Sequence, residues 1–168
     1  GKCLGGGMPI GIIAISSKIE KLMSKKKKKI FFGGTFSGNS ISTYVGMVTT
    51  KYIINNRKRI FSDLENKSVF FQNTLNKFIK KNNINAFIYR FKSMLRLVFT
   101  NQKVSNRTQR DFLELKNSKG INKLKAFLLK NGIYYPSSGV IFISTSTSKS
   151  DLIFISNIFK IGLKKYIK

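Results

Sequence analysis

The sequence has no histidine, no tryptophan, one cysteine and two prolines among its 168 residues. Without histidine the chain lacks imidazole bases, nucleophile–histidine pairs and most zinc sites, so we expect no metal site. The lone cysteine, Cys3, excludes an intrachain disulfide and favours a reducing, cytoplasmic location. No apolar run approaches the roughly 18 residues of a membrane span, and no secretory signal pattern is present.

Acidic residues are also scarce, with six Asp and Glu against 32 Lys and Arg and a net charge of +26. The six carboxylates are scattered and do not pair as two-carboxylate hydrolysis requires. If the chain is an enzyme, its chemistry therefore rests on a lysine, a hydroxyl group or a cofactor.

The positive charge by itself would indicate a nucleic-acid-binding protein. The excess is nearly all lysine, however, whereas recognition of phosphates and bases relies on the bidentate guanidinium of arginine. Abundant Lys, Ile, Asn and Phe together are what A/T-rich codons would produce. We therefore expect no specific nucleic-acid partner and keep a lysine-rich RNA-binding protein as the alternative from a different class. The one short aromatic and basic stretch, residues 89–92, is more simply a half-buried strand.

The first forty residues hold two glycine-rich segments. Residues 5–11 are dense in glycine and precede residues 12–15, an apolar, β-branched run that predicts a buried strand. Ser16 or Ser17 is expected to cap a short helix that ends at Met23.

The second glycine-rich segment, residues 33–39, is expected to lie at the N-terminus of a helix. Apolar residues then recur at helical spacing, namely Ile41, Val45, Val48, Tyr52 and Ile53. Another helix is predicted for residues 62–81. It is followed by two strands, two helices, a third strand and a last helix, at residues 86–91, 94–100, 111–115, 121–130, 140–144 and 148–166. Gly120 is expected to break the chain between the helices at 111–115 and 121–130. Ser148 with Asp151 resembles a capping box. This order predicts an α/β fold with antiparallel strands and a boundary near residue 40.

Residues 1–11 carry the first resemblance to a known family. Their pattern G-K-x-x-G-G-G-x-P-x-G resembles the stretch around the cofactor-binding lysine of class III pyridoxal-phosphate-dependent aminotransferases. The resemblance implies that Lys2 forms a Schiff base with pyridoxal 5'-phosphate and is the catalytic lysine. Such a lysine must lose its proton, so burial or a nearby cation must depress its pKa. Without the surrounding glycines, the alternative interpretation would be that Lys2 is one exposed lysine among many.

Residues 34–39 carry the second resemblance, to the family's G-T-L-S-G-N-P segment. By that resemblance Gly34 and Thr35 bind the cofactor phosphate, and the Thr35 hydroxyl reaches it from the neighbouring subunit of a homodimer. Backbone amides at a helix N-terminus suit an anion. A residue that only caps the helix is the alternative for Thr35.

Segments 93–100 and 129–137 are also similar to the family, so the resemblance covers the chain. It implies the C-terminal part of a fold-type I transferase. Residues 1–40 would be a remnant of the large domain, and residues 41–168 the connecting helix with a small α/β domain. Within the family the chain is most similar to glutamate-1-semialdehyde 2,1-aminomutases, which form 5-aminolevulinate for tetrapyrrole synthesis. Another class III aminotransferase, acting on a sugar or an amino acid, is the alternative.

Three departures from the family pattern bear on the substrate. Ser40 replaces a proline, residues 25–29 are five lysines in a loop normally rich in proline and glycine, and Thr147 stands where aminomutases often have histidine. The family's ring-stacking aromatic residue, its aspartate for the ring nitrogen and most of its phosphate ligands belong to the upstream half. We therefore expect a fragment that is inactive without its N-terminal half.

Overall fold

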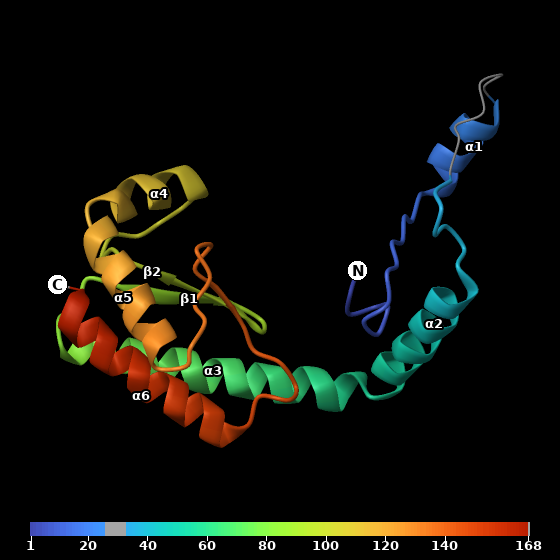
Figure 1. Cartoon of the computed structure of the whole chain (residues 1–168). Coiled ribbons are helices and arrows are strands. Elements are labelled where there is room, and N and C mark those ends of the chain that lie inside the picture. Colours follow the sequence, from blue (N-terminus) through green and yellow to red (C-terminus); the bar gives the residue numbers. More distant parts are fainter. Residues whose placement is uncertain (26–32, 168) are drawn as a thin grey trace. The chain divides into compact units, whose positions relative to one another are not determined.

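The computed structural model describes residues 1–25 and 33–167, which form two compact units, Gly1–Arg57 and Lys58–Lys168 (Figure 1). Each unit is considered by itself. These units do not test the expected division of the chain into a large-domain remnant, 1–40, and a small domain with its connecting helix, 41–168. That division stays a prediction. The solvated lysine loop expected at residues 25–29 lies almost wholly outside the described residues. No helix in the described ranges is long and apolar enough to cross a membrane.

The first unit contains a glycine-rich turn, an irregular segment and two helices, α1 (Ser17–Lys25) and α2 (Ser40–Asn55). In the turn, Gly7 N donates to Lys2 O at 3.1 Å. The predicted cap of the first helix is confirmed, because Ser16 Oγ accepts a hydrogen bond from Ile19 N at 3.4 Å.

The strand predicted at residues 12–15 is wrong for the described structure. The segment has no regular secondary structure and pairs with no strand of the described chain, and Ile12 and Ile13 are 64% and 80% exposed. A strand needs a hydrogen-bonded neighbour, and an apolar sequence alone cannot provide one.

Helix α2 begins where the second glycine-rich segment ends, as predicted. Asn39 caps it, with Oδ1 accepting from Ser42 N at 3.0 Å. Its apolar stripe does not face the core of this unit, since Ile41 and Tyr52 are exposed while Ser42 and Gly46 are buried. Small residues lie at the contact because the glycine-rich turn approaches the helix closely there.

The second unit is built on α3 (Arg57–Lys81) and an antiparallel sheet of β1 (Phe87–Phe91), β2 (Met94–Val98) and β3 (Val140–Phe142), in the order β1-β2-β3. The register pairs Tyr89 with Arg96 and Arg96 with Val140. One face of the sheet is buried, with Ile88, Leu95 and Leu97 in the core. The antiparallel sheet and the α/β class are as predicted.

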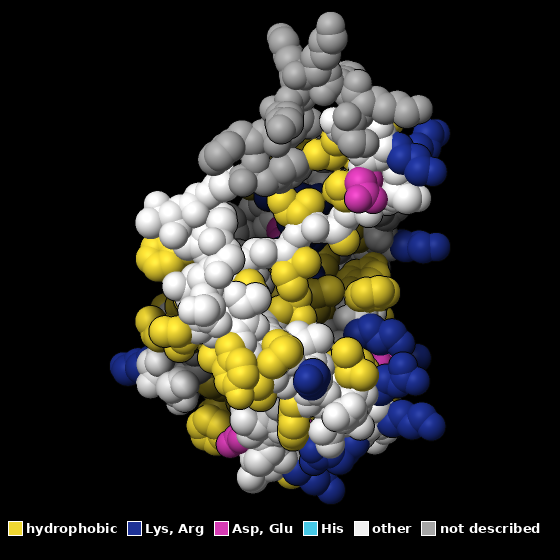
Figure 2. Space-filling view, turned by 90° about the vertical axis from the view of Figure 1, so that its right-hand side faces the viewer, with side chains coloured by type: hydrophobic (Ala, Val, Ile, Leu, Met, Phe, Trp, Pro, Cys, Tyr) yellow, Lys and Arg dark blue, Asp and Glu magenta, His cyan; other side chains and the backbone are white. Residues whose placement is uncertain are grey.

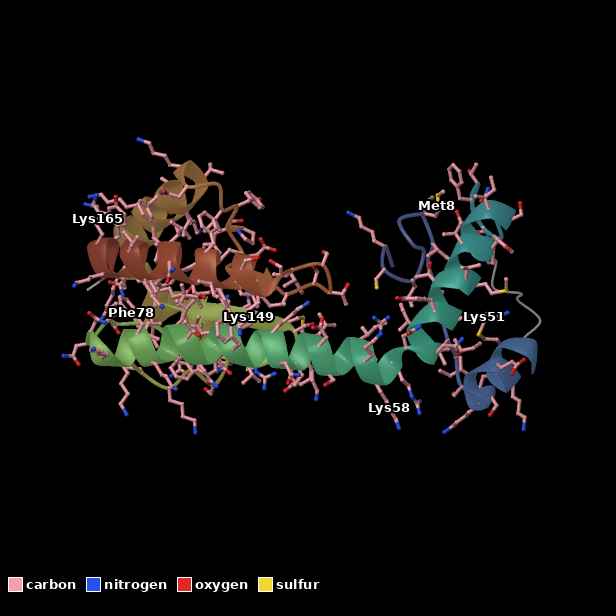
Figure 3. The ribbon with its side chains drawn as sticks, turned by 90° about the horizontal axis from the view of Figure 1, so that it is seen from below. Met8, Lys51, Lys58, Phe78, Lys149 and Lys165 are labelled. Carbon is pink, nitrogen blue, oxygen red and sulfur yellow. The ribbon has the colours of Figure 1, made fainter. Side chains whose placement is uncertain are left out.

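Three further helices complete the second unit: α4 (Arg107–Leu115), α5 (Ser118–Lys130) and α6 (Lys149–Tyr166). Helix α6 lies along α3 in Figures 1 and 3. The core that joins α3, the sheet, α5 and α6 includes Phe71, Leu75, Ile88, Leu97, Leu124, Leu128, Leu152, Phe159 and Leu163.

Two local expectations in this unit have different outcomes. The capping box is confirmed, because Asp151 N donates to Ser148 Oγ at 3.0 Å and Ser148 N donates to Asp151 Oδ2 at 2.8 Å. The break expected at Gly120 is wrong, because this residue lies inside α5. A Cβ atom at Gly120 would come within 2.5 Å of Tyr166 O, so this glycine permits the close approach of α5 to the end of α6.

Candidate functional site

The glycine-rich turn packs directly against α2, and glycine is required at the contact. Gly6 has a φ of +56°, and a Cβ atom there would lie 2.5 Å from Thr49 Oγ1 and 2.9 Å from Val45 Cγ1. On the helix, a Cβ atom at Gly46 would lie 3.0 Å from Ile10 Cδ1. The glycines therefore allow two backbones to approach closely. Figure 3 labels Met8 in the turn and Lys51 on α2.

A groove of about 830 Å³ lies where the turn, the second glycine-rich loop and α2 meet. Its walls are mostly apolar, with hydroxyl, amide and amine groups among them. The lining residues are Leu4, residues 9–12, Gly34, residues 36–39, Ser42, Thr43, Gly46, Met47, Thr50 and Lys51. The two segments identified from the sequence, far apart in the chain, thus flank one groove.

The three predicted site residues occupy different positions around this groove. Gly34 lines it, whereas Lys2 and Thr35 lie in the flanking segments without lining it. The Lys2 side chain is exposed, so the described residues do not bury its amine.

The loop that holds Gly34 and Thr35 forms two consecutive turns before α2. Ser37 N donates to Gly34 O at 2.9 Å, and Asn39 N donates to Phe36 O at 3.2 Å. These turns direct the chain into the helix, whose first amides have no intrahelical acceptor and carry a partial positive charge. This end of α2 suits an anionic group.

No protein-family model matches the chain. Comparison with curated proteins shows similarity over its whole length to glutamate-1-semialdehyde 2,1-aminomutases. The identity is 33% over 172 residues with the protein from Methanosphaera stadtmanae, and the match covers 100% of this chain and 38% of that relative. For Sulfolobus acidocaldarius the identity is 30% over 155 residues, covering 91% of this chain and 35% of the relative. In sequence the chain therefore resembles the glutamate-1-semialdehyde 2,1-aminomutases. The chain spans little more than a third of the length of these relatives and corresponds to a C-terminal part of them.

Solved structures show the same fold at lower sequence identity. An omega-transaminase from Sphaerobacter thermophilus superposes with a TM-score of 0.75 at 14% identity, over 95% of this chain and 36% of that structure. A glutamate-1-semialdehyde-aminomutase from Pseudomonas aeruginosa gives a TM-score of 0.69 at 13% identity, over 88% and 34%. The predicted fold, the C-terminal part of a fold-type I transferase, is confirmed.

The chemical groups around the groove fit pyridoxal phosphate in part. A primary amine at Lys2, a hydroxyl at Thr35 and a helix N-terminus at Ser40 match an aldehyde and a phosphate. The groove of the first unit has no carboxylate for the ring nitrogen of the cofactor among its described lining residues, because the one acidic residue of this unit, Glu20, lies in α1. The described part of the unit thus offers a primary amine and an anion-suited helix N-terminus, but no carboxylate near them.

The sequence motifs missed the groove wall contributed by α2. Ser42 and Gly46 are the buried residues of that helix, and Thr50 and Lys51 continue the wall. The signal was available in the small residues at positions 42 and 46, because an i, i+4 pair of small side chains allows another segment to pack closely on a helix.

Proposed function

We propose that the chain acts as the C-terminal part of a longer pyridoxal-phosphate-dependent enzyme that transfers an amino group, with Lys2 as its cofactor-binding lysine. The observation that supports this most is the glycine-rich motif around Lys2, whose turn packs closely against α2. The similarity to glutamate-1-semialdehyde 2,1-aminomutases supports the same reaction class, and one similar solved structure is a transaminase with pyridoxal phosphate bound.

Each proposed site residue has a chemical role. Pyridoxal phosphate, when bound, supplies the electron sink for negative charge at the substrate carbon. The Lys2 amine binds the cofactor aldehyde and afterwards serves as a base that moves a proton at Nζ. The Gly34 amide, the Thr35 hydroxyl and the N-terminus of α2 hold the phosphate of the cofactor in the neighbouring subunit.

The proposal requires the upstream part of the protein. Several large apolar residues of the first unit are exposed, among them Ile13, Phe36 and Tyr44 at 80%, 67% and 64%. Figure 2 shows apolar side chains exposed at the surface, among polar and basic ones. Large apolar side chains that are exposed together mark interaction surfaces. We therefore propose that the chain alone is inactive, and that it functions as a homodimer in which Thr35 reaches the partner's cofactor.

The proposed substrate class follows from the relatives. Their names include glutamate-1-semialdehyde 2,1-aminomutase, so we propose conversion of glutamate-1-semialdehyde to 5-aminolevulinate, for tetrapyrrole synthesis. Transfer to or from a sugar or another amino acid is the second candidate, because Thr147 departs from the aminomutase pattern. The single cysteine accords with the cytoplasmic location that we propose.

An activity assay tests the function and separates the two candidates. The chain, joined to its upstream part and loaded with pyridoxal phosphate, is supplied with glutamate-1-semialdehyde alone. Formation of 5-aminolevulinate without a keto acid supports the aminomutase. Turnover that requires a separate amino donor and acceptor supports the other aminotransferases. A folded, cofactor-loaded dimer without either activity would contradict the proposal.

A further inference from the structure

A second groove lies wholly within the second unit, between the C-terminal end of α3 and the start of β1. It encloses about 800 Å³, and residues 100–103, which follow β2, form its remaining wall. The Asn76 side chain fixes the spacing of α3 and β1. Its Oδ1 accepts from Ile88 N at 2.8 Å, and its Nδ2 donates to Ile88 O at 3.1 Å. The groove is therefore bounded by elements that are bonded to each other.

The charge of this groove is positive and uncompensated. Lys77 and Lys80 from α3 and Lys103 from the following loop line it with exposed side chains. None of its described lining residues is acidic. Lys67 of α3 differs from these lysines, because its Nζ lies 2.7 Å from Asp63 Oδ2. A concave site lined by one sign of charge concentrates ligands of the opposite sign.

Two aromatic rings stand at the edge of the groove. Phe87 and Tyr89, two residues apart on β1, remain 43% and 37% exposed. Their ring centroids are 5.0 Å apart at an angle of 70°. The Tyr89 hydroxyl accepts a hydrogen bond from Val104 N at 3.2 Å, which holds its ring in place. Such partly exposed rings offer faces on which a planar base can stack.

Side-chain amides complete the lining. Asn83, Asn85, Asn101 and Gln102 also line the groove, and Asn85 Oδ1 is buried without a donor among the described residues. Amide groups both donate and accept, which suits the edge of a base.

We propose that this groove binds a nucleotide unit, either free or within a single strand. The base lies against Phe87 and Tyr89, and the phosphates lie at Lys77, Lys80 and Lys103. The site goes beyond the proposed aminotransferase function, because none of its residues is assigned to that reaction. General positive charge would attract any polyanion, so the test must compare equal charge changes inside and outside the groove.

The measurement is fluorescence anisotropy of a labelled oligouridylate with the whole chain. Replacing Lys77, Lys80 and Lys103 by glutamine should weaken binding about tenfold or more. It should also reduce the slope of log affinity against log salt by about 2, the value for three lost phosphate contacts on a single strand. The matched control replaces three exposed lysines of α5, Lys119→Gln, Lys123→Gln and Lys130→Gln. Its affinity should change less than about threefold, and an equal loss in both triple variants would overturn the proposal.

A second pair of variants keeps the test valid if a lysine variant fails to fold. Phe87→Leu should weaken binding about tenfold by removing a stacking surface, whereas Phe91→Leu, on the same strand but outside the groove, should not. Equal effects of the two, or none, would overturn the proposal. Displacement of the oligonucleotide by ADP assigns the groove to free nucleotides, and resistance to ADP assigns it to a strand. Equal displacement by inorganic phosphate would contradict base binding.

Discussion

Replacing Glu114 with alanine should destabilise the second unit strongly, because this carboxylate is a main partner of a nearly buried arginine. Glu114 Oε2 lies 3.0 Å from Arg96 Nη2 and 3.8 Å from Arg110 Nε, and Glu114 Oε1 accepts from Phe99 N at 3.3 Å. The side chains of Arg96 and Glu114 are 18% and 14% exposed. Nε and Nη1 of Arg96 are buried and donate to no described atom. Loss of the carboxylate would leave a buried charge without its ion-pair partner, at a cost of about 3–5 kcal/mol.

A second substitution separates this cause from a simple loss of packing. Arg96→Met, added to Glu114→Ala, removes the unpaired charge and should restore about 2 kcal/mol. The matched control is Arg107→Met in the same background. Arg107 is 85% exposed and pairs with Asp111, so its removal should restore nothing. Urea unfolding of the whole chain, followed by circular dichroism, gives the free energies. If Arg96→Met adds a further loss to Glu114→Ala, the buried-charge explanation is wrong.

Three further predictions concern single residues of the second unit. Gly120→Ala should cost about 1–3 kcal/mol, because its Cβ would clash with Tyr166 O, whereas alanine at an exposed position of α5 should be neutral in thermal unfolding. Burial raises the pKa of Tyr135, so its contribution to stability is full below about pH 10 and declines as the pH rises above that value. Tyr135→Phe should flatten this alkaline decline, and an unchanged pH profile would contradict the assignment. Hydrogen bonds from Ser148 lower the pKa of Asp151, so its contribution is present above about pH 4 and is lost as the pH falls further. Asp151→Asn should flatten this acid dependence of the melting temperature, while a profile like that of the parent would refute it.

Elements with local signals could be predicted from the sequence. The capping box at Ser148 and Asp151 and the antiparallel pair β1 and β2 depend on residues that are close in the chain. Such signals are contained in the segment itself, so they hold whatever else the protein contains.

Features that depend on distant partners could not be predicted in this way. Residues 12–15 have the composition of a strand, but they pair with no strand in the described chain. The apolar stripe of α2 predicts a buried face, whereas the buried residues are Ser42 and Gly46, which the glycine-rich turn contacts. Periodicity gives the presence of a helix, but the packing partner decides which face is covered.

The candidate site could be located from its sequence motifs, whereas the physical environment of its residues could not be predicted. The spacing of the glycines identified the segments of Lys2 and Thr35, and the structure brings these segments to one groove. The exposure of Lys2 and the contribution of α2 required coordinates, because neither leaves a pattern in the lysine motif itself.

The most direct test of the proposed function is to locate the lysine that binds the cofactor. The chain, joined to its upstream part, is incubated with pyridoxal phosphate and reduced with borohydride, and its peptides are analysed by mass spectrometry. We expect one pyridoxyl group, on Lys2. Lys2→Ala should abolish the label, while Lys18→Ala, which removes another exposed lysine of the first unit, should leave it unchanged. A folded protein labelled at random lysines, or labelled equally well after Lys2→Ala, would contradict the assignment.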